Sequence, residues 1–398
     1  MKDLQKMSPI EFKSCSILAS VYALRMLGMF LILPIFAIYA TNLDSNPTSL
    51  QIGLALGIYG LTQAIFQIPF GMSSDYFGRK KVIYFGLLLF IIGSLIAGYS
   101  TSIEGIILGR SIQGSGAISA VLTALLADIT REEQRTKAMA IIGASIGLTF
   151  ALSLVLSPWL NDVIGVDGIF ILMAILSFIA FLLVYFFIKE PEIRKEKTKT
   201  SADEFLKILK DINLFRMNFG IFVLHATQIS MFMIIPIYLV NQGGINLSDH
   251  WQIYLPVLFF SFLLMIPIII FSEKFKKIKI AFLSAIIILF LAQLVFIIFG
   301  NTLIGIILAL LIYFVGFNFL EASLPSLVSK IAPINKKGLA LGVYNTSQSL
   351  GIFVGGALGG LITKVYGYNA SFVFCIALIF LWFVLSLGMQ VANYKKAN

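Results

Sequence analysis

Apolar runs of about twenty residues recur along almost the whole chain, and they limit what it can fold into. A helix of that length crosses the roughly 30 Å of hydrocarbon in a bilayer and satisfies its own backbone hydrogen bonds there. The sequence therefore predicts an all-α membrane protein with twelve transmembrane helices. The approximate runs are 14–40, 51–71, 81–101, 104–127, 137–160, 168–188, 214–240, 251–272, 280–299, 303–328, 339–362 and 369–391.

The composition agrees with a lipid-facing surface. Only 12% of the residues are charged and 59% are hydrophobic, whereas about a quarter of the residues in soluble domains are charged. The two cysteines, Cys15 and Cys375, lie inside apolar runs, so we expect packing residues rather than a disulfide. The first run is too long for a cleavable signal peptide and lacks a small-residue cleavage site, so we expect it to remain as the first span.

The basic residues indicate the orientation of the chain. All but three of the 29 lysines and arginines lie at the termini or in alternate connections, on one side of the predicted bundle. The exceptions are Lys364 on the other side and Arg25 and Arg110 inside spans. The positive-inside rule therefore places both termini in the cytoplasm, and we expect the inner membrane of a bacterium. The basic residues that set this orientation also account for the net charge of +10, so we expect no nucleic-acid partner.

The connection 189–213 is longer than the others and rich in Lys, Glu and Thr. It divides the chain into a six-helix bundle at 1–188 and another at 214–398. A faint repeat supports this division, because residues 135–145 resemble residues 337–347 at an offset of 202 positions. Two related halves are typical of transporters that bind substrate near the middle of the membrane, between the halves.

The connection after the second run reads Gly71-Met-Ser-Ser-Asp75-Tyr-Phe-Gly78-Arg79-Lys80-Lys81. Gly71 and Gly78 permit a tight reversal between helices, Asp75 suits a helix N-terminus, and Arg79 suits pairing with a carboxylate. A solvated basic turn that follows the positive-inside rule is an equally good interpretation.

The fourth run contains Leu108-Gly-Arg110-Ser-Ile-Gln113-Gly114-Ser-Gly116-Ala117. An arginine inside an apolar helix is costly and usually functional, and the small residues after it allow a neighbouring helix to approach closely. The alternative is an arginine bonded to carbonyls for packing.

Together these two segments resemble signatures of the major facilitator superfamily. The pattern G-x-x-x-D-x-x-G-R-[RK] matches Gly71, Asp75, Gly78, Arg79 and Lys80. The pattern R-x-x-Q-G-x-[GA]-A of the drug/proton antiporter branch matches Arg110, Gln113, Gly114, Gly116 and Ala117. The resemblance covers essentially the whole chain and is greatest to the YajR-type transporters, through residues 24–30, 57–71 and 135–139. It implies two six-helix bundles that alternate access to a central cavity.

Two departures from the family pattern bear on this resemblance. Tyr76 follows Asp75 where a basic residue is usual. The fifth run contains Gly143 and Gly147 but lacks the Gly-Pro-x-x-Gly-Gly core of many antiporters. The second departure weakens the antiport assignment more than the fold.

The resemblance also implies a cytoplasmic gate. In it, Asp75 caps a helix of the opposite half, Arg79 pairs with Asp128, and Arg135 joins the cluster. Protonation of an acid in this cluster is then expected to favour the inward-open state.

Glu321 is the one carboxylate well inside a span. An apolar environment favours the protonated form of a carboxylate, which makes Glu321 a candidate proton carrier. The alternative is a glutamate locked to a neighbouring cation or amide. Arg25 and His225 fall at similar depths in the first and seventh runs, and His225 is equally interpretable as a titrating group or a packing residue.

The other cavity candidates are polar or amphipathic residues within spans. They are Tyr59, Gln63, Gln67, Gln113, Asn318, Tyr344 and Gln348. Gly351, Gly355 and Gly359 are interpreted as a close helix contact that can slide. Because no Walker-type sequence occurs, we expect no ATP. No cluster of metal ligands is apparent in the sequence, so we also expect no metal and no cofactor, with the proton gradient as the source of energy.

Two transport functions remain open from the residues. The first is proton-coupled efflux of small amphipathic molecules, and the second is a symporter or facilitator for a metabolite such as a sugar, nucleoside or organic acid, since Arg25 and Arg110 suit an anionic substrate. An enzyme is disfavoured because the histidines, His225 and His250, lie on different elements and no catalytic triad is apparent. A channel is disfavoured by the two-half repeat. The expected partners are a small-molecule substrate, protons and the lipid bilayer, with a monomeric protein.

Overall fold

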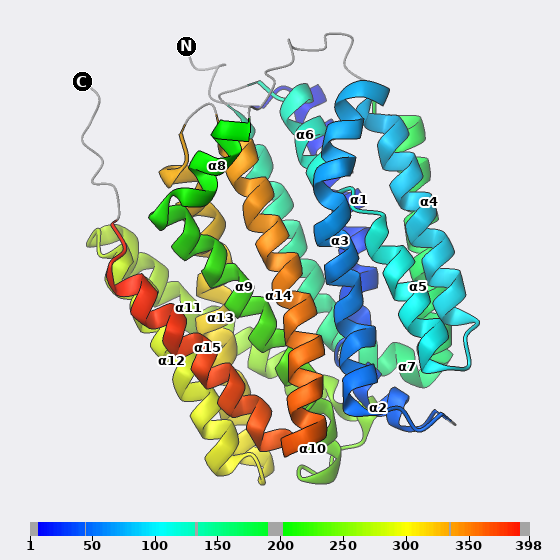
Figure 1. Cartoon of the computed structure of the whole chain (residues 1–398), viewed down its shortest axis with the longest axis vertical. Helices are drawn as coiled ribbons and strands as arrows, with labels where there is room; N and C mark the ends of the chain where they lie inside the picture. The colour runs from blue at the N-terminus through cyan, green and yellow to red at the C-terminus, as the bar shows by residue number, and fades with distance from the viewer. Residues whose placement is uncertain (1–6, 44, 132–133, 190–201, 334–335, 391–398) are drawn as a thin grey trace. The chain divides into compact units, whose positions relative to one another are not determined.

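The computed structural model describes residues 7–43, 45–131, 134–189, 202–333 and 336–390, and the described elements are all helical (Figure 1). The chain divides into two compact units, Met1–Lys199 and Thr200–Asn398. Residues 190–201 of the predicted linker 189–213 lie outside the described residues. The first unit contains α1 (Pro9–Leu31), α2 (Phe36–Thr41), α3 (Ser49–Phe77), α4 (Arg79–Gly98), α5 (Ile103–Ser115), α6 (Ser119–Ile129) and α7 (Arg135–Phe187).

The second unit contains one short amphipathic helix followed by the remaining spans. Its helices are α8 (Ala202–Lys210), α9 (Ile212–Phe232), α10 (Ile235–Asn241), the 3-10 turn η3 (Leu247–Asp249), α11 (Trp251–Lys274), α12 (Ile278–Phe299), α13 (Leu303–Ile331), α14 (Lys337–Tyr366) and α15 (Tyr368–Leu387).

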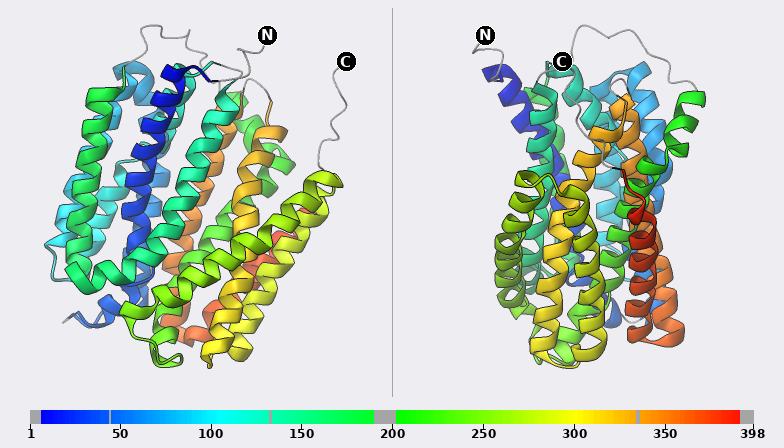
Figure 2. Two further views of the ribbon diagram at one scale, coloured as in Figure 1. Left: turned by 180° about the vertical axis from the view of Figure 1, so that it is seen from behind. Right: turned by 90° about the vertical axis from the view of Figure 1, so that its left-hand side faces the viewer.

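Eleven segments among the described residues are long and apolar enough to cross a membrane, and one of them supplies two crossings. Lys137–Phe187 has 51 residues, which corresponds to about 77 Å of helix, more than twice the thickness of the hydrocarbon core. The non-helical Gly165, with φ of 68°, bends α7 into two arms, and α1 lies between them in the left view of Figure 2. With this division, the described helices supply the twelve crossings that the sequence predicts.

Several spans begin at residues that cap a helix. Ser8 accepts from the backbone N–H of Glu11, and its own N–H donates to the Glu11 carboxylate. Thr48 and Gln51 form the same reciprocal capping box at the start of α3. These bonds satisfy backbone groups that have no partner within the helix and so fix where each helix starts.

Three predicted runs are interrupted, which corrects the expectation of continuous helices. The run 14–40 breaks near Pro34, and 214–240 breaks before Pro236, because proline lacks the N–H that continues a helix. The run 104–127 breaks after Ser115, where a Cβ on Gly116 would lie only 2.2 Å from the carbonyl oxygen of Gly86 on α4. The close approach of α4 therefore coincides with the break between α5 and α6.

The glycine strip on α14 is a close helix contact, as predicted. A Cβ on Gly351 or Gly355 would lie 2.3 Å from the carbonyl oxygen of Phe222 or Ala226 on α9. No side chain fits between these backbones, which is how small residues bring membrane helices together. Both cysteines are free and buried, as expected for packing residues.

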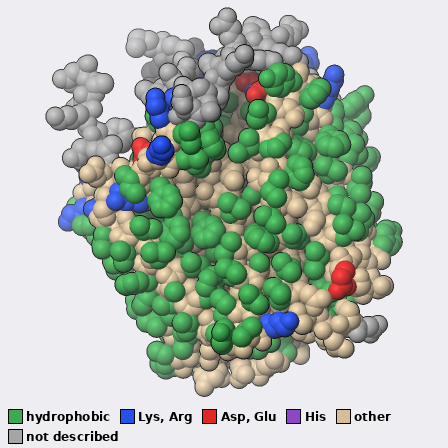
Figure 3. Space-filling view, viewed as in Figure 1, with side chains coloured by type: hydrophobic (Ala, Val, Ile, Leu, Met, Phe, Trp, Pro, Cys, Tyr) green, Lys and Arg blue, Asp and Glu red, His purple; other side chains and the backbone are tan. Residues whose placement is uncertain are grey.

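The outer surfaces of the helices carry large apolar side chains. Phe259 on α11 is 63% exposed and Ile304 on α13 is 80% exposed. Hydrophobic side chains are spread over the face shown in Figure 3. Such a surface is stable when lipid, rather than water, surrounds the helices.

Candidate functional site

The interior of the first unit contains two arginines joined by one tyrosine. Arg25 on α1 is fully buried, and its Nη2 donates to the hydroxyl of Tyr59 at 2.9 Å and to Gln63 Oε1 at 3.4 Å. The guanidinium carbon of Arg110 on α5 lies 5.0 Å from the centre of the Tyr59 ring. Tyr59 thus contacts both cations, one through its hydroxyl and the other through its π face.

Arg25 also bonds to the break in the fourth span. Its guanidinium donates to the Gly116 carbonyl at 3.1 Å and to the Ser119 hydroxyl at 2.7 Å. The break between α5 and α6 frees backbone carbonyls inside the bundle, where an unpaired polar group is costly. Arg25 satisfies one of them, so it holds the two halves of this span in position.

Arg110 bonds to backbone and amide groups. It donates to the Ala55 carbonyl at 3.3 Å and to Gln113 Oε1 at 2.9 Å, and the Gln113 amide donates to the Ser94 hydroxyl at 2.8 Å. This geometry matches the packing interpretation of Arg110. Among the described residues, no ion pair includes either Arg110 or Arg25, so both charges are held by neutral dipoles.

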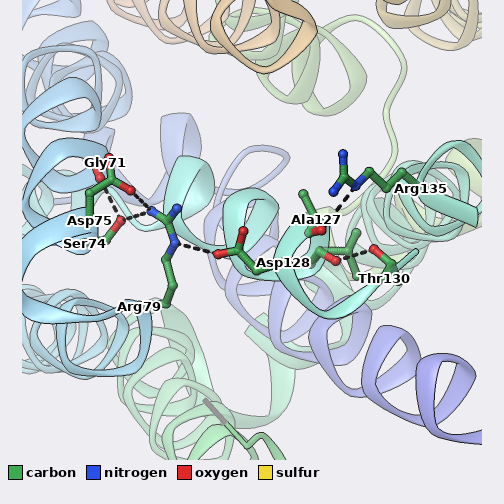
Figure 4. A network of polar contacts seen from close by, with 9 residues as sticks. Gly71, Ser74, Asp75, Arg79, Ala127, Asp128, Thr130 and Arg135 are labelled. Carbon is green, nitrogen blue, oxygen red and sulfur yellow. Dashed lines mark hydrogen bonds and ion pairs between the residues drawn. The ribbon is translucent and has the colours of Figure 1, made fainter. Parts of the chain in front are cut away.

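Near the ends of α3 and α6, Arg79 bridges two carboxylates (Figure 4). Its Nη1 lies 2.7 Å from Asp75 Oδ1, and its Nε lies 3.0 Å from Asp128 Oδ2. We call Asp75, Arg79 and Asp128 the gate cluster. The predicted pair between Arg79 and Asp128 is therefore present, whereas the predicted contact of Asp75 with the opposite half stays a prediction.

The two glycines of this segment have different positions. Gly78 has φ of 95° and forms the turn between α3 and α4, as predicted. Gly71 lies inside α3, so the prediction that it forms part of the turn is wrong. Its carbonyl instead accepts from Ser74, whose hydroxyl also accepts from Arg79. Gly71 thus supports the orientation of Arg79 through its backbone.

Arg135 and Lys80 lie beside the gate cluster and bond to helix ends. Arg135 Nε donates to the carbonyl of Ala127, the neighbour of Asp128, at 3.2 Å. Lys80 Nζ donates to the Ile188 carbonyl at 2.6 Å, just after α7 ends. A cation near a helix C-terminus is stabilised by the orphan carbonyls there.

The second unit places His225 on α9 beside Gln348 on α14. The His225 Nε2 lies 2.8 Å from the Gln348 amide nitrogen, and its Nδ1 lies 3.3 Å from the Ile221 carbonyl. A neutral imidazole with its proton on Nδ1 satisfies both bonds, since Nε2 then accepts from the amide. His225 is 3% exposed.

Glu321 on α13 has a different environment. Its Oε2 is buried without a hydrogen-bond partner, and so is the hydroxyl of Tyr344 on α14. Asn318, one turn earlier, donates to Ser261 at 3.0 Å instead. In the part of the chain that the structure describes, no cation pairs with Glu321, so the locked-glutamate alternative lacks its cation. Gln67 on α3 is likewise buried with its amide unpartnered.

The sequence does not predict the ion pair between Glu11 and Arg131. Glu11 accepts from the Nη2 and Nε of Arg131 at 2.9 and 3.0 Å and from the Arg131 backbone N–H at 2.9 Å. This pair connects the start of α1 to the residues that follow α6, close to Asp128. The spacing Ser8-x-x-Glu11 signals a capping box, but no sequence pattern assigns it Arg131 as a partner.

Comparisons with known proteins agree with this architecture. The family model described as Major Facilitator Superfamily matches residues 18–356 and 322–397. The inner membrane transport protein YajR of Escherichia coli (strain K12) is 40% identical over 394 residues, which cover 98% of this chain and 86% of YajR.

More distant relatives include drug-resistance proteins. Multidrug resistance protein 2 of Bacillus subtilis (strain 168) is 26% identical over 96% of this chain and 95% of its own length. Among solved structures, a bacterial homologue of the human lysosomal transporter Spinster superimposes with a TM-score of 0.77 at 12% identity, covering 96% of this chain and 97% of the homologue. At that identity the likeness shows the fold alone.

Proposed function

Because this chain belongs to the major facilitator superfamily and is therefore a multi-pass inner membrane transporter rather than an enzyme, we propose that it exports small amphipathic molecules in exchange for protons. The relation to multidrug resistance protein 2 supports a substrate of that kind. The resemblance of Arg110, Gln113 and Gly114 to the antiporter pattern supports the direction of coupling. No ATP or organic cofactor takes part, and the protein acts as a monomer.

The unpaired carboxylate of Glu321 is the observation that carries this proposal. It has no cation partner among the described residues, and its Oε2 has no hydrogen-bond donor. A carboxylate that no cation holds can bind a proton and release it when water reaches it from either side. Glu321 thus supplies the proton-carrying group that exchange requires.

The gate cluster sets which state of the transporter is favoured. Arg79 connects the end of α3 with the end of α6 through Asp75 and Asp128. Loss or protonation of either carboxylate removes one of these connections. We expect such a loss to weaken the cytoplasmic closure and to favour the inward-open state.

A second function, symport or facilitated transport of an anionic metabolite, is favoured by a separate observation. Arg25 and Arg110 place two positive charges in the first unit, and no described carboxylate pairs with them. An anionic substrate gains from that charge, whereas a cationic substrate does not.

Flux measurements in proteoliposomes separate the two functions. We expect an imposed pH gradient to drive amphipathic dyes against their own gradient, in the direction opposite to proton movement, and Glu321→Gln to remove nearly all of this uphill flux. Counterflow, which needs no net proton transfer, should persist in Glu321→Gln. Uphill flux in the same direction as the protons, or uphill flux retained by the variant, contradicts the proposal.

A further inference from the structure

Helix α8, which leads into the second unit, exposes both apolar and basic side chains. Leu206 and Leu209 are 47% and 41% exposed, whereas Ile208 is only 3% exposed. Lys207 and Lys210 are also exposed. A helix of nine residues that leaves two leucines uncovered is unstable against water unless something apolar covers them.

The side chains of α8 fall on three sides of the helix. Ile208 lies on the side that packs against the unit, where α8 contacts α9 and α14 (Figure 1). Leu206 and Leu209 are three residues apart and therefore share a second side, and Lys207 and Lys210 share a third. The apolar and basic sides are adjacent, which is the arrangement of a helix at a membrane surface.

The exposed leucines continue into the lipid-facing surface of α9. Ile212 and Phe215, in the first turns of α9, are 52% and 43% exposed. Ile212–Asn241 is itself a candidate membrane span. The apolar surface therefore runs from α8 directly onto a helix that enters the bilayer.

The joint between α8 and α9 has a defined geometry. Asp211 lies between them, and its Oδ1 accepts from the backbone N–H groups of Asn213 and Leu214 at 2.9 and 3.0 Å. This N-cap fixes the start of α9. The position of α8 is thus set by the packing of Ile208 on one side and by the Asp211 cap at its end.

The charges of α8 indicate which lipid it meets. Within the described ranges, no ion pair includes Lys207 or Lys210. The distribution of basic residues places α8 on the cytoplasmic side, where the membrane surface is negatively charged. Lysine side chains extend along apolar surface and place the ammonium group at headgroup level.

From this placement we propose that α8 is an interfacial helix that binds anionic phospholipid. Leu206 and Leu209 insert beside the acyl chains, and Lys207 and Lys210 bind the headgroups of the cytoplasmic leaflet. A soluble protein partner is disfavoured because two leucines offer much less area than a stable protein interface buries. This lipid contact goes beyond the transport function and does not depend on it.

Fluorescence quenching by lipid tests the proposal in the full-length protein. An environment-sensitive fluorophore is attached to Leu209→Cys in a Cys15→Ala/Cys375→Ala background. The protein is reconstituted into phosphatidylcholine vesicles with brominated acyl chains, with or without phosphatidylglycerol. We expect quenching that increases with phosphatidylglycerol, because each lysine near an anionic surface strengthens membrane binding about fivefold.

Two charge variants make the test specific. Lys207→Glu/Lys210→Glu should lose roughly half or more of the quenching in anionic vesicles. Lys274→Glu/Lys276→Glu makes the same charge change at two exposed lysines, one at the end of α11 and one just after it, and should leave the quenching unchanged. High salt should reproduce the loss without any substitution, since it screens the headgroup charge.

The outcomes separate lipid binding from its alternatives. Absence of quenching in both vesicle types places α8 away from the lipid and overturns the proposal. Quenching that is equal with and without phosphatidylglycerol, and unaffected by Lys207→Glu/Lys210→Glu, overturns the role of the anionic headgroup. Because no substrate is added, the result is independent of the antiport proposal.

Discussion

The interiors of the two units differ in whether their buried ionisable groups have hydrogen-bond partners. In the first unit, Arg25 and Arg110 are buried and bonded to carbonyls, hydroxyls and amides. In the second unit, Glu321 has a buried oxygen without a partner. A charge surrounded by fixed dipoles is held in place, whereas an unpartnered carboxylate is free to change its protonation state. We therefore propose that the first interior supports the architecture and that the second carries the coupling.

The largest effect is expected from removing Arg25. Arg25→Met keeps the length and apolar stem but leaves the Gly116 carbonyl and the Tyr59 hydroxyl without their donor. Losing several hydrogen bonds to a buried charge should lower the free energy of unfolding by about 3 kcal/mol or more. Thermal unfolding in detergent measures this loss.

Arg25→Lys is the matched control because it keeps the charge but not the planar fork. Partial recovery of stability is expected, since one ammonium group cannot reach all the acceptors of the guanidinium. If Arg25→Met is as stable as the wild type, the interior of the first unit does not depend on this arginine. The structural role assigned to that interior is then wrong.

Glu321→Gln should produce the next largest effect, and on transport rather than on stability. Without a titrating group, we expect uphill flux to fall about 100-fold, an amount equivalent to about 2.7 kcal/mol of coupling. The amide is nearly the same size as the carboxyl group, so the unfolding temperature should stay close to that of the wild type. Parallel measurements of flux and unfolding check both parts.

The control for Glu321→Gln is Asn318→Asp on the same helix, which adds a carboxyl group one turn away. If proton coupling requires a carboxyl group at position 321 itself, the double variant Asn318→Asp/Glu321→Gln should not regain coupled flux. A strong loss of stability in Glu321→Gln alone would instead assign Glu321 a structural role, like that of the arginines.

The gate cluster should give a smaller effect because its groups are partly exposed. The side chains of Asp75 and Asp128 are 48% and 31% exposed, and pairs of this kind are worth about 1 kcal/mol or less. Asp128→Asn should therefore shift the balance toward the inward-open state by about fivefold or less, and Asp75→Asn by less than that. Thiol accessibility from the cytoplasmic side measures the shift.

The shift toward the inward-open state in Arg79→Lys should be smaller than in these variants, since lysine keeps the charge but cannot contact both carboxylates in the same way. An equal and large shift for Asp75→Asn would indicate an additional partner for Asp75, as its predicted contact with the opposite half requires.

The sequence predicts the helical crossings well because hydrophobic length is a local property. It also predicts the turn at Gly78 and the contact along Gly351 and Gly355, since both follow from the absence of a side chain. The break at Gly116 is not predictable in this way, because it coincides with the approach of α4 and with a bond from Arg25. The partner of Glu11 is missed for the same reason, since Arg131 lies 120 positions away.

The sequence likewise does not predict the local environment of each polar residue. Arg110 and Glu321 both read as charges inside apolar helices, yet one is bonded to backbone carbonyls and the other has an unpartnered oxygen. Their partners are set by which helices pack together, and periodicity does not determine that. The roles of these residues stay predictions until they are measured.

The smallest effect on transport is expected from replacing His225, which allows a bonded and an unbonded ionisable residue of the second unit to be compared. Its two ring nitrogens already have partners in Ile221 and Gln348, an arrangement that suits the neutral imidazole. His225→Gln keeps a polar group able to bond Gln348, so uphill flux should change by less than about threefold, or roughly 0.6 kcal/mol. The dependence of flux on pH should also stay the same, because the proposed proton carrier is Glu321 and not His225. If the pH profile of flux is displaced in His225→Gln while Glu321→Gln keeps its coupling, then His225 on α9 carries the proton and Glu321 on α13 does not.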